Sequence, residues 1–241
     1  MSISGNIAKV EERIQKACGA AGRKRGDITL MGVSKFVPVN MIEEAWQSGI
    51  RCFGESKIQE SLAKFETFRE DHPELDLHLI GSLQRNKAKK AVLFFDCIQS
   101  VDRLELIGEL DKFASMRQAA ARQAAARQAA ALNVLLELHT GEDSKSGFSG
   151  FDELFRAAEI VLSGANLKPQ GLMTMAPFTE DARLIRGSFR QLVKAQKELE
   201  RRFPPAENWT CLSMGMSNDF EIAVEEGSTM LRIGGGIFKE Q

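Results

Sequence analysis

The sequence contains no tyrosine, which excludes any mechanism that needs a phenol as its acid or base. It also lacks an apolar run near the ~20 residues that span a bilayer. The first residues, MSISGNIAKVEERIQKA, alternate charged with apolar positions and contain no apolar signal core. We therefore expect a cytoplasmic protein that does not enter a membrane.

Neither sign of charge is in excess. The chain carries 32 basic and 33 acidic residues, for a formal net charge of −1. Proteins that bind nucleic acids or anionic membranes usually carry an excess of clustered positive charge, and this sequence has no such excess. We expect neither as a partner.

Cysteine and histidine are scarce and show no ligand spacing. The four cysteines form no C-x-x-C pair, and three of them lie inside apolar, strand-like segments, where cysteine usually behaves as a small buried hydrophobe. The three histidines are equally scattered. We expect no disulfide and no metal site. These residues are Cys18, Cys52, Cys97, Cys211, His72, His78 and His139.

Short apolar segments alternate with amphipathic helical segments from one end of the chain to the other. Eight strands, each followed by a helix except the last, predict a parallel sheet. The length of 241 residues suits one (β/α)8 TIM barrel of roughly 250 residues, with an extra helix at the N-terminus and residues 1–241 forming a single domain. The predicted strands cover 28–35, 51–56, 77–82, 97–102, 133–140, 170–177, 209–217 and 230–238.

A doubly wound open sheet is the alternative architecture. Its dinucleotide-binding version needs G-x-G-x-x-G after the first strand, and this chain has none there.

Residues 117–131 contain three copies of the pentad RQAAA. Ala, Arg and Gln are strong helix formers, so with residues 102–116 they predict about 30 helical residues, ~45 Å long, as an elongated fourth helix. Each five-residue step turns the helix by about 140° net, so Arg117, Arg122 and Arg127 point in different directions and form no stripe for nucleic acid. We expect a solvated spacer.

In a barrel the functional residues lie at the carboxyl ends of the strands. Lys35 ends the apolar segment MGVSK, and RIGGG, Arg232 to Gly236, ends the last strand. Apolar walls favour the neutral amine that forms Schiff bases, while glycines let backbone N–H groups approach a phosphate. Separately, the lysine could be an ordinary strand-end charge and the glycines a bulged final strand. Together they are the two anchors that pyridoxal 5'-phosphate (PLP) requires.

Nearly the whole chain resembles the pyridoxal phosphate homeostasis proteins, which share the barrel of the alanine racemase amino-terminal domain. The segments that carry the resemblance are VSKFVPVNMIEEAWQSGIRCFGESKIQE, HLIGSLQRNKAKK, IQSVDR, GEDSKSGF, GLMTMAP and LSMGMSNDFEIAVEEGSTMLRIGGGIF. The resemblance implies that PLP is held as a Schiff base on Lys35 and that Arg232 contacts the pyridine nitrogen. It also implies that Ser213, Ser217, Gly234 and Gly235 lie around the phosphate, that Ser56 lies beside the cofactor ring and that Met214 is among the cofactor-binding residues.

Three departures from the family pattern stand out. Ser56 replaces the asparagine of F-G-E-N, so a hydroxyl takes the place of an amide. Gly235 replaces a Ser or Thr after R-I-G, which removes a hydroxyl beside the phosphate. The helix before GEDSKSGF is about two pentads longer than usual. The first two changes bear on cofactor affinity.

The residues favour a PLP carrier that serves cofactor homeostasis and delivers PLP to apoenzymes, acting as a monomer without turnover. A permanently charged arginine leaves the pyridine nitrogen unprotonated and weakens PLP as an electron sink. Alanine racemases add a tyrosine from a second domain as the other base, and this chain has no tyrosine. A PLP-dependent racemase or lyase, and an interaction scaffold with vestigial PLP, are the alternatives.

Overall fold

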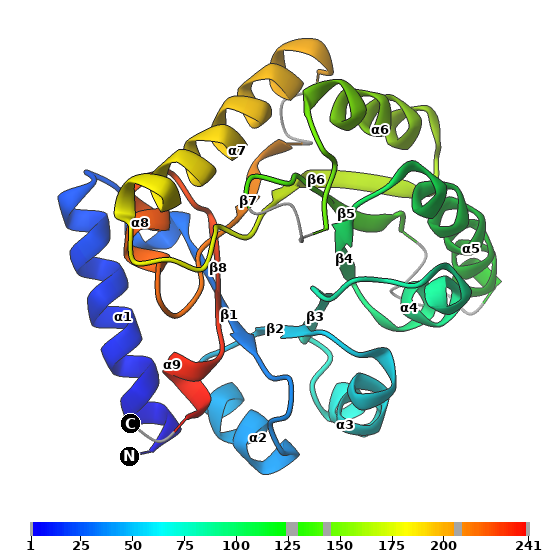
Figure 1. Ribbon diagram of the computed structural model, residues 1–241. Coiled ribbons are helices and arrows are strands. Elements are labelled where there is room, and N and C mark those ends of the chain that lie inside the picture. Colours follow the sequence, from blue (N-terminus) through cyan, green and yellow to red (C-terminus); the bar gives the residue numbers. More distant parts are fainter. Residues whose placement is uncertain (1, 124–129, 142–145, 205–208, 240–241) are drawn as a thin grey trace.

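The chain folds as a closed barrel of eight parallel strands surrounded by helices (Figure 1). The computed structural model describes residues 2–123, 130–141, 146–204 and 209–239. Each strand pairs with the next in sequence and β8 pairs with β1, which confirms the barrel and rules out the open sheet. The strands are β1 (Thr29–Val33), β2 (Cys52–Glu55), β3 (Asp76–Leu79), β4 (Cys97–Val101), β5 (Leu132–Glu137), β6 (Leu167–Met173), β7 (Cys211–Ser213) and β8 (Met230–Ile233).

The helices form a ring around the strands and cover their outer face (Figure 1). In the long helix that follows β6, Ile185, Phe189 and Leu192 recur at helical spacing and are buried against the barrel. None of the helices within the described ranges is long and apolar enough to cross a membrane. The helices are α1 (Ile3–Ala20), α2 (Val39–Gln47), α3 (Ile58–Asp71), α4 (Ala88–Phe94), α5 (Leu104–Gln123), α6 (Phe151–Ser163), α7 (Ala182–Arg202), α8 (Phe220–Glu225) and α9 (Gly235–Phe238).

The prediction for the last strand is wrong at its end. β8 stops at Ile233, and the residues predicted to continue it form the short helix α9, with Gly234 as its N-cap. Three consecutive glycines carry no side chain to pack on a pleated sheet, so nothing keeps them extended. Ile237 and Phe238 instead become buried in the core from the helix.

The expected extra N-terminal helix is α1, and it lies beside α9, so that the two ends of the chain are neighbours (Figure 1). The buried Asn6 side chain donates from Nδ2 to the carbonyls of Ile237 (3.0 Å) and Lys239 (3.2 Å). Helix C-terminal carbonyls lack intrahelical partners. Asn6 therefore supplies donors that a four-residue helix cannot provide for itself.

Sulfur fills much of the barrel interior. Met31, Cys52 and Met230 form one buried cluster, and Cys97, Leu135 and Met173 form another, with Cys211 packed against both. In most barrels of this kind, branched aliphatic side chains fill the interior. All four cysteines are unpaired, as expected.

The alanine-rich repeat begins inside the fold, so the expectation of a solvated spacer is wrong for its first arginine. Arg117 of α5 is buried and donates from one nitrogen to the carbonyls of Val92 (2.9 Å) and Phe95 (3.0 Å) at the end of α4. Burial lowers the pKa of Arg117, although nearby Asp96 opposes this. The described part of α5 ends at Gln123; residues 124–129 and the Arg122 and Arg127 side chains lie outside what the structure describes.

Replacing Arg117 with Met should reduce the free energy of unfolding by about 1–3 kcal/mol, because two buried carbonyls lose their donor. Lys112→Met, on the exposed face of the same helix, removes the same charge and should change stability by no more than about 0.5 kcal/mol. Urea unfolding of both variants measures the difference. Equal stability of the two would show that Arg117 does not cap α4.

Candidate functional site at the carboxyl ends of the strands

Lys35 lies in the turn that follows β1, at the carboxyl end of the barrel. Its side chain is exposed and makes no hydrogen bond or ion pair with the residues that the structure describes. The next residue, Phe36, has φ of 62°, the only positive φ of a non-glycine residue in the described chain. Backbone of this kind is strained in a bulky residue and persists where its surroundings hold it. The Glu60 carboxylate does so by accepting from the Phe36 N–H (2.5 Å).

Behind this turn, Lys64 of α3 is fully paired. Its Nζ contacts Glu55 (2.6 Å) and Glu60 (3.0 Å) and donates to the Ser34 carbonyl (2.7 Å). Glu55, at the end of β2, is completely buried and also accepts from the Ser34 hydroxyl (2.7 Å). Burial raises the pKa of Glu55, while Lys64 and Ser34 pull it down. In the sequence, the one signal of this role for Lys64 is its i, i+4 spacing from Glu60.

Arg232 of β8 is buried inside the barrel. It donates to the Ser213 carbonyl (2.6 Å), the Ser213 hydroxyl (2.8 Å) and the Thr174 carbonyl (2.8 Å). Burial lowers its pKa to about 10, although Asp219 and Glu137 act to raise it. The guanidinium therefore remains a cation at neutral pH, fixed in position by β6 and β7.

The residues predicted to surround a phosphate gather where β7 and β8 end. Ser217 accepts from the Gly236 N–H of α9 (3.3 Å), so the loop after β7 touches the start of α9. Gly234 packs tightly, because a Cβ added there would lie 3.3 Å from the Val33 carbonyl oxygen at the end of β1. Gly235 has more space, because a Cβ added there would contact only the Lys239 side chain, at 3.5 Å. Hydroxyls and backbone N–H groups of a first helical turn are suitable donors to an oxyanion.

Met214 and Ser56 complete the predicted set. The Met214 side chain is buried in the main core. Its N–H donates to the Met230 carbonyl, and its own carbonyl accepts from the Ser228 hydroxyl. Both backbone groups of Met214 are therefore already hydrogen-bonded within the protein. Ser56 follows β2 and is half-buried. Its main chain packs so closely on Gly81 that a Cβ there would clash with it.

Glu137, at the end of β5, is an acidic group that sequence analysis did not single out. It is buried, and the Ser146 hydroxyl donates to it (2.7 Å). Burial raises the pKa of Glu137, and the negative charge of Asp102 raises it further. The Ser146 hydrogen bond and the positive charge of Arg232 partly offset this rise. The carboxyl end of the barrel thus combines a free lysine, a buried arginine and buried carboxyl groups.

The chain is similar to proteins of a known family. The model of the alanine racemase N-terminal domain matches residues 6–241. The pyridoxal phosphate homeostasis protein of Aquifex aeolicus is 36% identical over 241 residues, covering 100% of this chain and 99% of that protein. The protein of the same name from Vibrio cholerae is 37% identical over 243 residues, covering 100% and 97%.

Among solved structures, PipY of Synechococcus elongatus PCC7942, determined with PLP bound, superposes with a TM-score of 0.81 at 31% identity and covers 98% of this chain and 100% of its own. The histidine racemase of Leuconostoc mesenteroides superposes with a TM-score of 0.69 at 17% identity, and this chain covers 57% of it. The second likeness shows the barrel fold alone.

Glu137→Gln should weaken the dependence of stability on pH. Because burial raises the pKa of Glu137, the folded state holds this proton more tightly than the unfolded chain does. Stability from Glu137 is therefore present below its unfolded pKa and lost as pH rises through the folded pKa. The free energy of unfolding, measured by urea denaturation from pH 4.5 to 7, should fall less in the variant than in the parent.

Glu198→Gln is the control. Its ion pair with Arg201 lowers the pKa of an exposed carboxyl, so its small contribution has the opposite sign, and it is lost as pH falls. Parallel profiles for the parent and Glu137→Gln would contradict the assignment of a raised pKa to Glu137.

Proposed function

This chain belongs to the family of pyridoxal phosphate homeostasis proteins, and we propose that it binds PLP at the carboxyl ends of its strands, as a Schiff base on Lys35. The single observation that carries the proposal is the contrast between two lysines. Lys64 is fixed by two carboxylates and a carbonyl, whereas Lys35 is exposed and unpaired among the described residues. Of these two lysines, only Lys35 has an amine that the described residues leave unengaged.

The linkage needs nothing beyond the two partners. The Lys35 Nζ would hold the cofactor, whose aldehyde would supply the carbon for a C=N linkage with water as the by-product. The turn that carries Lys35 is held by Glu60 at Phe36 and by Lys64 at Ser34, so the amine starts from a constrained backbone. This constraint reduces the conformational entropy that is lost on binding.

The other site residues fit the remaining parts of PLP. Ser217 and the glycines at the start of α9 would hold the phosphate, and the space beside Gly235 leaves room for its oxygens. Arg232 would face the pyridine nitrogen, with Ser213 fixing its guanidinium. Ser56 would lie beside the ring. PLP supplies a reactive aldehyde and an electron sink when bound, and these residues bind and orient it.

We propose that the protein carries PLP, acts as a monomer and delivers the cofactor to apoenzymes without catalysing turnover. Arg232 is a cation at neutral pH, since burial lowers its pKa only to about 10. A cation at the pyridine nitrogen keeps that nitrogen unprotonated and limits carbanion stabilisation. A racemase would also need a second base opposite Lys35, and the chain has no tyrosine to supply it.

Lys35→Ala should abolish covalent labelling by PLP and borohydride, because it removes the amine proposed to hold the cofactor, and it should leave the fold intact, because the exposed Lys35 side chain makes no hydrogen bond or ion pair with the described residues. Tryptic mass spectrometry of the reduced protein measures the label at each lysine. Lys57→Ala is the matched control, since Lys57 lies at the same end of the barrel, with its Nζ 5.0 Å from the Phe36 ring centre.

Full labelling of Lys35→Ala would overturn the assignment of Lys35, and full labelling of the parent at Lys64 would overturn the contrast on which it rests. Incubation of the PLP-loaded parent with L-amino acids, followed by chiral chromatography, tests the carrier function. Accumulation of D-amino acids would favour the racemase alternative.

A further inference from the structure

At the amino end of the barrel, opposite Lys35, several strands begin with a residue that can donate an electron pair to a metal. Cys52 is the first residue of β2, Asp76 of β3 and Cys97 of β4. In the parallel register, Cys52 lies opposite Asp76, and His78 lies two residues further along β3. Residues i and i+2 of a strand share a face, so pairing brings Cys52, Asp76 and His78 together.

We propose that these three residues bind a divalent transition-metal ion, Zn²⁺. One donor atom from each, the Cys52 sulfur, an Asp76 oxygen and a His78 ring nitrogen, all lie within 4.8 Å of one another. In a tetrahedral site with metal–ligand distances of 2.0–2.3 Å, neighbouring donors are separated by roughly 3.3–3.7 Å. The His78 Nε2 to Asp76 Oδ2 distance is 2.9 Å, so these two side chains would have to move slightly apart to admit the ion.

The chemistry of the donor set selects the ion. A thiolate, an imidazole and a carboxylate match the sulfur, nitrogen and oxygen ligands of Zn²⁺, whereas Mg²⁺ and Ca²⁺ prefer sites built from oxygen alone. The charges also balance, because one thiolate and one carboxylate neutralise a divalent cation. Cys52 and His78 are buried, and a buried charge is costly unless it is compensated.

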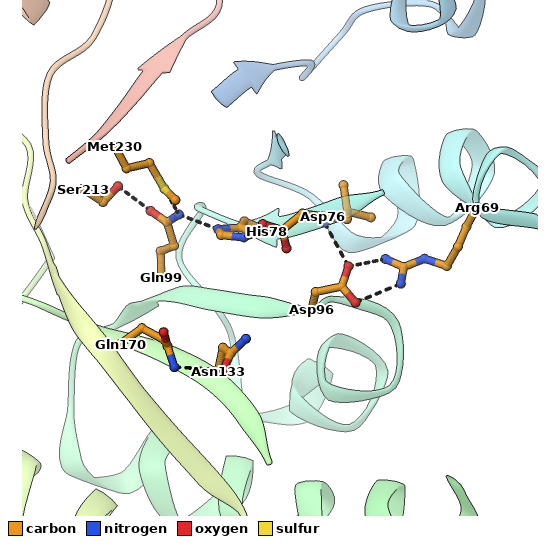
Figure 2. Close-up of polar contacts among 10 residues, drawn as sticks. Arg69, Asp76, His78, Asp96, Gln99, Asn133, Gln170, Ser213 and Met230 are labelled. Carbon is orange, nitrogen blue, oxygen red and sulfur yellow. Dashed lines mark hydrogen bonds and ion pairs between the residues drawn. The ribbon is translucent and has the colours of Figure 1, made fainter. Parts of the chain in front are cut away.

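Gln99 orients the ring of His78. Figure 2 shows the Gln99 amide between His78 and Ser213, with its Nε2 2.7 Å from His78 Nδ1 and its Oε1 accepting from the Ser213 hydroxyl (2.6 Å). Histidine ligands commonly donate their second ring N–H to an acceptor, whereas here the Gln99 Nε2 donates and Nδ1 accepts. Coordination through Nε2 places the ring proton on Nδ1, so the Gln99 amide would turn its oxygen toward His78.

An ion has a route to this site. A cavity of about 450 Å³ reaches Asp76 and His78 and is also lined by Cys97, Cys211 and Met230. The Asp76 side chain is 46% exposed, so solvent reaches one ligand directly. Water from this cavity would occupy the fourth coordination position, as in zinc sites with three protein ligands.

The test is equilibrium dialysis of the chelator-treated full chain against Zn²⁺ in excess Mg²⁺, with metal counted by elemental analysis. We expect one Zn²⁺ per chain in the parent and in Lys35→Ala, because Lys35 lies at the opposite end of the barrel from the three proposed ligands. In Lys35→Ala, Co²⁺ should produce thiolate-to-metal charge-transfer absorption without interference from PLP.

Cys52→Ser, Asp76→Asn and His78→Gln should each weaken Zn²⁺ binding by at least about a hundredfold, and Gln99→Leu by about 10–100-fold, the usual cost of losing an outer partner. Cys211→Ser is the matched control, since Cys211 lines the same cavity outside the trio, and it should bind as the parent does. Zn²⁺ should raise the unfolding temperature of the parent and of Cys211→Ser but not of Cys52→Ser.

Asp76→Asn guards against a loss of folding, because it changes a half-exposed residue by a single atom. Substoichiometric binding by the parent, or one equivalent retained by Cys52→Ser and Asp76→Asn alike, would overturn the proposal. The second result would mean that Zn²⁺ binds surface carboxylates only.

Discussion

Parallel pairing between β8 and β1, which sets Arg232 opposite Met31 and Ile233 opposite Gly32, joins the last strand of the chain to the first. Both ends of the molecule depend on this closure. At the carboxyl end it brings the turn carrying Lys35 next to Gly234, which packs on the last residue of β1. A parallel sheet directs all its strand ends to one edge, and closure makes that edge a ring. Residues from opposite ends of the sequence can then act on one ligand.

A continuous line of polar side chains connects the two ends of the barrel. Arg232 donates to the Ser213 hydroxyl. Ser213 donates to Gln99, and Gln99 contacts His78 (Figure 2). His78 in turn lies against Asp76. Burying a polar group in a core costs free energy unless the group is hydrogen-bonded. Here each side chain of the series is hydrogen-bonded or ion-paired to the next. The position of Arg232 therefore depends on side chains deep in the barrel as well as on its immediate neighbours.

Sequence periodicity and strand-end position were enough to predict the barrel and to single out Lys35 and Arg232, because parallel strands place their ends together whatever their exact limits. Contacts made across elements were not predictable in this way. Lys64 and Arg117 looked like ordinary helix-surface charges, and only packing shows that one pairs with Glu55 and the other caps α4. The trio that includes Cys52 was invisible because its spacing is set by strand register, which no local pattern encodes.

The contact between Asn6 and Ile237 joins residues separated by 231 positions. During synthesis α1 is made long before β8 and α9. The first helix therefore lacks this partner until seven strands have been made, so the glycine-rich end of the site assembles only after the rest of the barrel. Such long-range closure slows folding and leaves strand edges open until the barrel closes.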